Sequence, residues 1–400
     1  MVQHRGHNEG SVYKKRDKWI VSVSYKDTNG NAKRTAKTCA TKTEANEARI
    51  ALLAQRQQGT DLTTNKQTVA EFISDMLDKH FNGDQSTREC YQRTMRLHVY
   101  PYPIGRMELG KLTPKMLADH YYRLRTVPRE RKAGERPTKA LSNRSVELVH
   151  DIVHKQFKQA VRWGLIPKNP ADDVTAPRPE KHDILVLDAE QRAALLTAAR
   201  GDDLEALYIV ALGTGMRVSE ILGLRWSDVT WPEGRRPGTL TVRKQAKRTK
   251  ARGLHLDDTK TDKPRVIPAI GPVMFALQAH RDRQTFHKAL GVAWTDLDLV
   301  FANGEGKLME AQNLHRRSWK PLLRRAGLPT TTTFHALRHT YATHCLQQGI
   351  DINTVQTWLG HATSKMLLEV YAHYIPAHGE SQLDRLDTLL GGTSHGQMAS

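Results

Sequence analysis

The stretch Phe334-His335-Ala336-Leu337-Arg338-His339-Thr340-Tyr341-Ala342-Thr343-His344 holds the densest pattern of reactive side chains in the sequence. His335 and Arg338 are three positions apart, which places an imidazole and a guanidinium side by side on a helix. His335 and His339 have the spacing of a helical zinc pair, but the zincin motif needs Glu directly after the first His, where Ala336 stands. No cysteine or carboxylate is placed to complete a tetrahedral set. The stretch therefore favours a His–Arg pair that faces a phosphate, and we expect no metal site.

Two earlier stretches carry charged residues of the same kind. In Gly215-Met216-Arg217-Val218-Ser219-Glu220, Arg217 and Glu220 share one face of an expected helix. Such a pair is often only a helical ion pair. In Thr259-Lys260-Thr261, Lys260 lies in an expected hairpin turn ahead of a strand. Turn lysines are usually solvated, so Lys260 alone indicates no function.

A Gly–His pair and two tyrosines follow the central stretch. Gly360-His361 precedes Tyr371-Ala372-His373-Tyr374. A tyrosine in such a place most often serves packing, because reactive residues are rare against the structural background. Tyr371 therefore gains significance only from its position behind the other three motifs.

The chain is strongly basic. Its 400 residues include 61 Lys and Arg against 42 Asp and Glu, a formal net charge of +19. That field attracts polyanions, of which nucleic acid is the commonest in a cell, and the alternative is a basic protein without such a partner. No run approaches the roughly 18 apolar residues of a membrane span, and the first residues lack the apolar core of a secretory signal. The three cysteines, which are far apart in the sequence, suit a reducing compartment; they are Cys39, Cys90 and Cys345. We therefore expect a cytoplasmic protein without a membrane partner.

Residues 10–60 are expected to form a small unit of their own. Trp19–Tyr25 alternates like a strand, and Arg34–Cys39 reads as a returning strand. A helix follows, with Thr41 or Thr43 as its N-cap. Lys and Arg outnumber Asp and Glu here, and a basic sheet backed by a helix can enter a DNA groove, although a solvated basic module is the alternative. The side chains expected to contact DNA are Lys14, Lys15, Arg16, Lys18, Trp19 and Arg34.

The remainder of the chain mixes helices with short strands. Residues 66–176 read as mostly helical, and the prolines and charges of Ala176–His182 suit an exposed linker. Beyond it, Asp188 and a Gln three positions later form a capping pair, and short strands are expected at Thr239–Arg243 and Arg265–Pro268. The fold class is therefore a multidomain, mainly α-helical protein with small β-sheets (α+β).

The order of the four motifs resembles the catalytic domain of the tyrosine recombinase family, over roughly residues 186–376. The flanking residues match too: Gly-x-Arg-x-Ser-Glu, Thr-Lys-Thr, His-x-Leu-Arg-His-x-x-Ala-Thr and Leu-Gly-His. Residues 10–60 are similar to the arm-binding domain of phage integrases. The resemblance implies an arm-type DNA-binding domain (1–65, a three-stranded sheet plus helix), a helical, SAM-like core-binding domain (66–176), a linker (177–185), a mixed α/β catalytic domain (186–390) and a disordered tail (391–400).

The resemblance also implies a role for each motif residue. Tyr371 attacks the scissile phosphate and forms a 3′-phosphotyrosyl link, while Arg217 and Arg338 hold the phosphate oxygens. The link retains the energy of the broken bond, so neither a nucleotide nor a metal cofactor is expected. The other roles are leaving-group protonation by Lys260, acid–base chemistry by His335, a phosphate hydrogen bond from His361 and orientation of neighbours by Glu220.

Two of these assignments have a nearby alternative. Tyr374 lies one helical turn from Tyr371, and His373 after the nucleophile favours Tyr371. The preceding residues Met366–Val370 depart from the threonine-rich sequence common in the family, which keeps the one-turn alternative open. Lys263 lies near Lys260, and the Thr-Lys-Thr context favours Lys260.

The resemblance implies an integrase that integrates and excises a phage or integrative element. Its expected partners are double-stranded DNA core and arm sites, three further copies of the chain in a homotetramer on DNA, a host DNA-bending protein and an excision factor. Its expected location is the host cytoplasm, on the nucleoid when bound to DNA. The rivals are a type IB topoisomerase and a non-enzymatic DNA-binding regulator. A separate basic N-terminal unit disfavours the first, and the complete motif set disfavours the second.

Overall fold

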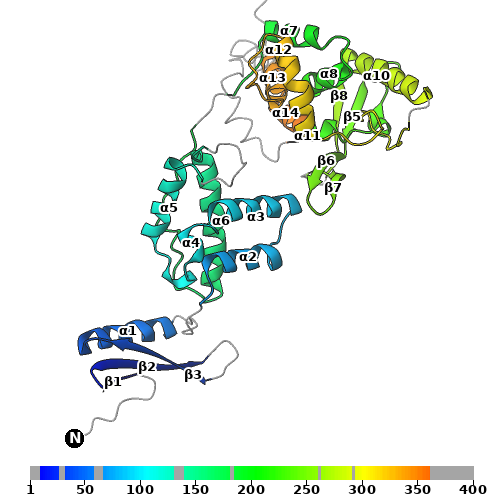
Figure 1. The fold of residues 1–400 in the computed structure, drawn as a ribbon. Coiled ribbons are helices and arrows are strands. Elements are labelled where there is room, and N and C mark those ends of the chain that lie inside the picture. Colours follow the sequence, from blue (N-terminus) through cyan, green and yellow to red (C-terminus); the bar gives the residue numbers. More distant parts are fainter. Residues whose placement is uncertain are drawn as a thin grey trace, which may run out of the picture. The chain divides into compact units, whose positions relative to one another are not determined.

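The computed structural model describes residues 10–26, 32–57, 66–129, 139–180, 184–259, 263–290 and 293–360. The chain divides into two compact units, Met1–Lys181 and His182–Ser400. Figure 1 shows the helices and strands of both units.

The first unit begins with a small antiparallel sheet backed by one helix. Val21, Val23 and Tyr25 alternate along the middle strand and are buried with Cys39 and Ala45. Thr41 caps the helix, because its Oγ1 accepts a hydrogen bond from the Glu44 N–H at 3.2 Å, so the first of the two expected caps is confirmed. The strands lie in the order β1-β2-β3, and the bounds are β1 Ser11–Lys15, β2 Lys18–Lys26, β3 Ala32–Cys39 and α1 Lys42–Gln57.

A helical bundle with its own apolar core follows in the same unit. Phe72 and Phe157 meet edge-on at its centre, with ring centroids 6.4 Å apart. Thr68 and Glu71 form a reciprocal capping box at the start of α2. The bounds are α2 Val69–Lys79, α3 Gln85–His98, α4 Pro103–Arg106, η1 Leu109–Lys111, α5 Pro114–Thr126 and α6 Asn143–Arg162.

The second unit is an α+β domain. Its three-stranded sheet has the order β4-β5-β8, and a separate hairpin pairs β6 with β7. Its strands are β4 Val229–Thr230, β5 Gly238–Val242, β6 Lys244–Thr249, β7 Gly253–Asp258 and β8 Arg265–Ala269. Its helices are α7 Ala189–Ala199, α8 Glu205–Thr214, α9 Val218–Ile221, η2 Trp226–Asp228, α10 Gly271–Ala289, α11 Ala311–Leu314, η3 His315–Trp319 (a π-helix), α12 Lys320–Arg325, α13 His335–Gln347 and α14 Ile352–Leu359.

The core of the second unit surrounds α8. Tyr208 and Trp319 are fully buried with ring centroids 5.9 Å apart, and the Trp319 indole donates a 2.9 Å hydrogen bond to the carbonyl of Thr332. α8 packs against α10, α13, α9 and β8. This packing gathers the ends of several elements around the C-terminal end of α8.

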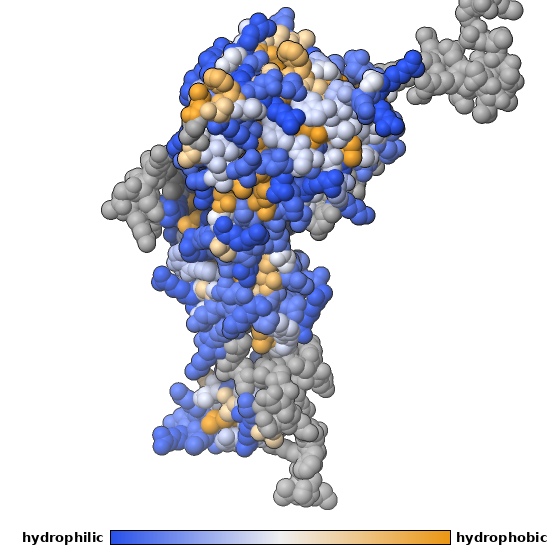
Figure 2. Space-filling view, turned by 90° about the vertical axis from the view of Figure 1, so that its right-hand side faces the viewer, coloured by the Kyte–Doolittle hydropathy of each residue, from blue (hydrophilic) through white to orange (hydrophobic). Residues whose placement is uncertain are grey.

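The expected fold class is confirmed by helices with small antiparallel sheets. Hydrophilic residues cover most of the face drawn in Figure 2, with hydrophobic patches between them. Within the described ranges, no helix is both long and apolar enough to span a membrane.

Candidate active site

Arg217 lies at the turn between α8 and α9. α8 ends at Gly215, whose φ of 62° is left-handed. A Cβ at Gly215 would come within 2.5 Å of Tyr341 Cδ1, so the turn requires glycine. The chain then enters α9 with Arg217 at the N-cap, its side chain 38% exposed. The turn therefore presents a cation at the surface.

Glu220 is the buried counter-charge of this cation. Its side chain is 3% exposed and accepts four hydrogen bonds from two arginines. The Arg217 backbone N–H lies 2.8 Å from Oε2, and Arg217 Nη1 lies 2.9 Å from Oε1. Arg265 Nη2 lies 2.6 Å from Oε2 and Nη1 3.0 Å from Oε1. Burial acts to raise the pKa of Glu220, but the hydrogen bonds and charges of Arg265 and Arg217 outweigh it and hold the pKa below its usual range.

Arg338 lies on α13 and is 3% exposed. Its Nη1 donates to the carbonyl oxygen of Gly215 at 2.8 Å, and its Nη2 donates to that of Leu359 at 2.7 Å. The guanidinium therefore ties the end of α8 to the end of α14.

The C-terminus of α14 is held by three arginines. The last three carbonyl oxygens, those of Trp358, Leu359 and Gly360, accept hydrogen bonds from three different guanidinium groups. A helix C-terminus carries partial negative charge on its unpaired carbonyls, so it attracts cations. The donors in order are Arg265 Nε at 2.8 Å, Arg338 Nη2 at 2.7 Å and Arg217 Nη2 at 3.4 Å.

His335 is the first residue of α13, and its side chain is partly open to solvent and partly covered by the surrounding protein. Its ring meets His339 edge-on, with centroids 4.7 Å apart. Partial burial, then the charges of Arg338 and Arg217, lower the pKa of His335. Burial, followed by His335 and Arg338, lowers the pKa of His339 to about 4. Both imidazoles are therefore neutral near pH 7, so that a His335 nitrogen can accept a proton.

The structure brings together four of the residues singled out in the sequence, Arg217, Glu220, His335 and Arg338. The other motif residues lie outside the described residues: Lys260, His361, Tyr371 and the alternative Tyr374. Their neighbours in sequence do lie in the site. Gly360 accepts a hydrogen bond from Arg217, and Arg265 follows Lys260 by five positions.

Arg265 is the residue of this site that sequence reasoning missed. In the sequence it marks only the start of a strand, which the structure confirms as β8. Its hydrogen bonds reach Glu220 and Trp358, 45 and 93 positions away. The one available signal is a basic residue shortly after Thr-Lys-Thr, which alone does not distinguish a buried ion pair from a solvated side chain.

The six expected DNA contacts of the N-terminal sheet differ in their surroundings. Lys14, Lys15, Arg16 and Lys18 are exposed around the β1–β2 turn. Arg34 donates hydrogen bonds to the hydroxyls of Ser22 and Ser11. Trp19 packs partly against the small core, with Lys42 Nζ 5.7 Å from its ring centroid.

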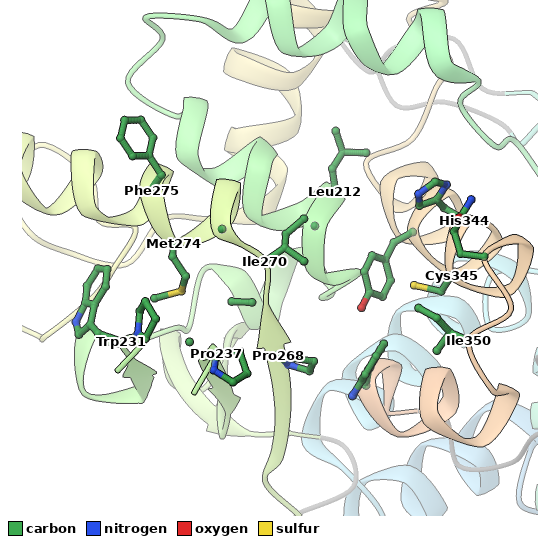
Figure 3. Close-up of a pocket in the computed structure, with 18 of the residues that line it drawn as sticks. Leu212, Trp231, Pro237, Pro268, Ile270, Met274, Phe275, His344, Cys345 and Ile350 are labelled. Atoms are coloured by element: carbon green, nitrogen blue, oxygen red, sulfur yellow. The ribbon is translucent and has the colours of Figure 1, made fainter. Parts of the chain in front are cut away.

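A large hollow in the second unit is apolar. Its volume is about 850 Å³, and Figure 3 shows Leu212, Ile270, Met274 and Phe275 among the side chains that line it. None of the described residues that line it is Lys or Arg. Among the described residues, no group of three or more His, Cys, Asp or Glu is placed to hold a metal ion.

Comparison with known proteins places this site in a family. The sequence model of the phage integrase family matches residues 186–378. Tyrosine recombinase XerC of Chlamydia muridarum is 30% identical over 237 residues, which cover 58% of this chain and 67% of that protein. The chain belongs to the tyrosine recombinase family. An integrase of Streptomyces ambofaciens is 27% identical over 394 residues, covering 94% of this chain and 95% of that protein, so this family member matches an integrase along nearly its whole length.

Solved structures of the family share the fold. The Tn1549 transposon integrase in complex with transposon right end DNA has a TM-score of 0.64 at 23% identity, covering 81% of this chain and 100% of that chain. A lambda integrase tetramer bound to a Holliday junction has a TM-score of 0.56 at 18% identity, covering 88% and 96%. At these identities the likeness shows the fold alone.

Proposed function

We propose that this tyrosine recombinase is an integrase that cuts and rejoins DNA attachment sites through a 3′-phosphotyrosyl intermediate and a Holliday junction. It would integrate and excise a phage or other integrative element. The observation that carries the proposal is the convergence of Arg217 and Arg338 on the C-terminus of α14, directly before His361 in the sequence, with His335 near both arginines.

The arrangement suits phosphoryl transfer. Arg217 and Arg338 are planar donors that stabilise charge on the non-bridging oxygens of a phosphodiester. Glu220 restricts the rotamers of Arg217 before DNA arrives, so less orientational freedom is lost on binding. His335 is neutral and exposed, as a proton acceptor for a tyrosine must be.

The proposed reaction exchanges one phosphoester for another. The Tyr371 oxygen loses its proton to His335 and bonds to phosphorus, while the bond from phosphorus to the 5′ oxygen breaks. Lys260 gives a proton to that oxygen, and His361 donates a hydrogen bond to the phosphate. The free 5′ hydroxyl of a partner strand then attacks the phosphotyrosyl link and releases the tyrosine, which reverses the same steps. The reaction therefore consumes no nucleotide and requires no metal ion. We assign these roles to Lys260, His361 and Tyr371 because of their positions in the sequence motifs.

The proposed assembly follows from the domain organisation. In this proposal residues 1–65 bind the arm sites. Residues 66–176 and 186–390 bind the core site and are joined by the linker 177–185. Four copies of the chain assemble on two DNA segments. The exposed cations Lys14, Lys15, Arg16 and Lys18 support the first assignment. A host DNA-bending protein and an excision factor would set the direction of the reaction.

The nucleophile provides the test. A labelled duplex with a nick near the cut site traps the covalent intermediate, which a denaturing gel resolves. Tyr371→Phe should abolish the adduct and leave DNA binding within about twofold, whereas Tyr374→Phe should retain the adduct. An adduct that persists in Tyr371→Phe and disappears in Tyr374→Phe would move the nucleophile by one helical turn. If the unaltered chain formed no adduct, the result would favour a non-enzymatic DNA-binding regulator. If it relaxed supercoiled DNA without exchanging strands, the result would favour a type IB topoisomerase.

A further inference from the structure

Arg265 is almost completely enclosed although it carries a full charge. Its side chain is 9% exposed at the first position of β8. A buried cation is costly unless it is paired and hydrogen-bonded. Arg265 meets both conditions, since it donates to both Glu220 carboxylate oxygens at 2.6 and 3.0 Å and to the Trp358 carbonyl at 2.8 Å.

These contacts lead to two parts of the proposed phosphate site. Through Glu220, Arg265 fixes the carboxylate that binds both the backbone N–H and the guanidinium of Arg217. Through Trp358, it fixes the C-terminus of α14, three positions before His361. Arg265 is therefore hydrogen-bonded to the carboxylate that holds Arg217 and to the end of α14.

Gly360, which has no side chain, lies directly against the Arg265 side chain. Gly360 ends α14 with a φ of 65°. A Cβ there would lie 3.1 Å from both Cδ and Nη1 of Arg265. Such a contact is tighter than ordinary packing, so the glycine lets α14 end directly against Arg265.

We propose that Arg265 is a positioning residue for DNA cleavage, which aligns Arg217 through Glu220 and holds the C-terminus of α14 through Trp358. The inference rests on the proposed function of the site. It adds to the motif a residue that does not touch DNA and yet sets the rate of the chemical step.

The role has a consequence for pH. Glu220 is faced by Arg217 at the N-cap of α9, by Arg265 from β8 and by His335 from α13. Burial is the largest influence on Glu220 and acts to raise its pKa, and Arg265 opposes it most strongly. Without Arg265 the carboxyl should therefore take up a proton at higher pH than in the unaltered chain. A protonated Glu220 would orient Arg217 less well, so cleavage should weaken as the pH falls.

The test measures single-turnover cleavage of the nicked duplex at saturating protein, with DNA affinity measured separately. Arg265→Gln should lower the cleavage rate constant about 100-fold, as expected for a misplacement of about 1 Å, and change affinity less than about twofold. Arg265→Lys keeps the charge and one hydrogen bond, so it should recover part of the rate.

Arg325 offers a matched control in the same unit. It also pairs with a carboxylate and a carbonyl, Asp202 Oδ2 at 2.7 Å and Ala198 O at 3.3 Å. Neither of these partners belongs to the site, so Arg325→Gln should cleave at the unaltered rate. Melting curves of each variant identify any loss of folded protein.

The pH profile separates positioning from a general loss of structure. Arg265→Gln should lose cleavage toward acid pH beyond any loss in the unaltered chain. The double variant Arg265→Gln/Glu220→Gln has no carboxyl to protonate, so it should lack that additional loss. Cleavage by Arg265→Gln at the unaltered rate, or an equal acid loss in both variants, would overturn the inference. An unaltered chain that forms no adduct would instead reject the proposed function.

Discussion

Arg338 Nη2 donates a 2.7 Å hydrogen bond to the carbonyl oxygen of Leu359, the last residue of α14. The same guanidinium binds Gly215 at 2.8 Å. A side chain that is 3% exposed thus joins two helix ends before any DNA is present. A residue of this kind serves stability and chemistry together, and the two can be separated by substitution.

Arg338→Lys should lower both the stability of the fold and the rate of DNA cleavage, by different amounts. An ammonium can reach one of the two carbonyls, so one charged hydrogen bond is lost, which costs about 1.5–3 kcal/mol of unfolding free energy. Cleavage should fall by a factor of about 100 or more, because a planar donor to the phosphate is lost as well. Chemical denaturation and the trapped-adduct assay measure the two effects. Arg325→Lys is the control, and equal effects of both substitutions would contradict the special place of Arg338.

Glu220→Gln should destabilise the second unit in a pH-dependent way. Removal of one charge leaves Arg265 buried without its counter-ion, at a cost of about 3–5 kcal/mol near pH 7. The pKa of Glu220 is lower in the folded chain than its unfolded value of about 4.3. Its contribution is therefore complete above that value and is lost as the pH falls through the folded pKa. The stability gap between the variant and the unaltered chain should be constant at neutral pH and narrow below about pH 4.

Denaturant titrations at neutral and acid pH measure this gap. The expected result is parallel unfolding curves near neutrality that converge in acid. A gap that widens as the pH falls would mean that Glu220 is protonated, or unpaired, in the folded chain.

Several elements could be predicted from local pattern alone. Asp188 caps α7 with Gln191 in a reciprocal box, as the sequence predicts, and the capping box of Thr68 and Glu71 at α2 is of the same local kind. These features depend on residues within one helical turn of each other. Local chemistry therefore suffices to place them.

The β6–β7 hairpin shows where local pattern is insufficient. Its first strand carries no apolar alternation, and charged pairs join the two strands: Lys244 with Asp258 at 2.8 Å and Lys247 with Asp257 at 3.0 Å. Such strands look like a polar loop until their partners are known. The site shows the same limit. Motif residues stand out by type and order, whereas Arg265 acquires its role through contacts with distant positions.

Recombination should proceed in a strong chelator. In the proposed reaction Arg217, Arg338 and Lys260 supply the positive charge that a divalent cation supplies in other phosphoryl transfers. The trapped-adduct assay in EDTA should give at least half the adduct formed in buffer. A reaction that stopped in EDTA and resumed only with added magnesium would reject the metal-free mechanism.

The N-terminal sheet should bind a DNA site distinct from the one that is cut. The sheet and α1 bury a small core of their own, and Lys14, Lys15, Arg16 and Lys18 are exposed around one turn. Phosphate contacts by these cations would make binding salt-dependent, and a tether to the rest of the chain raises the local concentration of the second site. Removal of residues 1–65 should therefore spare cleavage of an isolated core site but reduce recombination of long substrates with flanking sites at least tenfold. If the sheet added only non-specific affinity, the shortened chain would recombine normally at lower salt, and footprints of the full chain would show no protected flanking site.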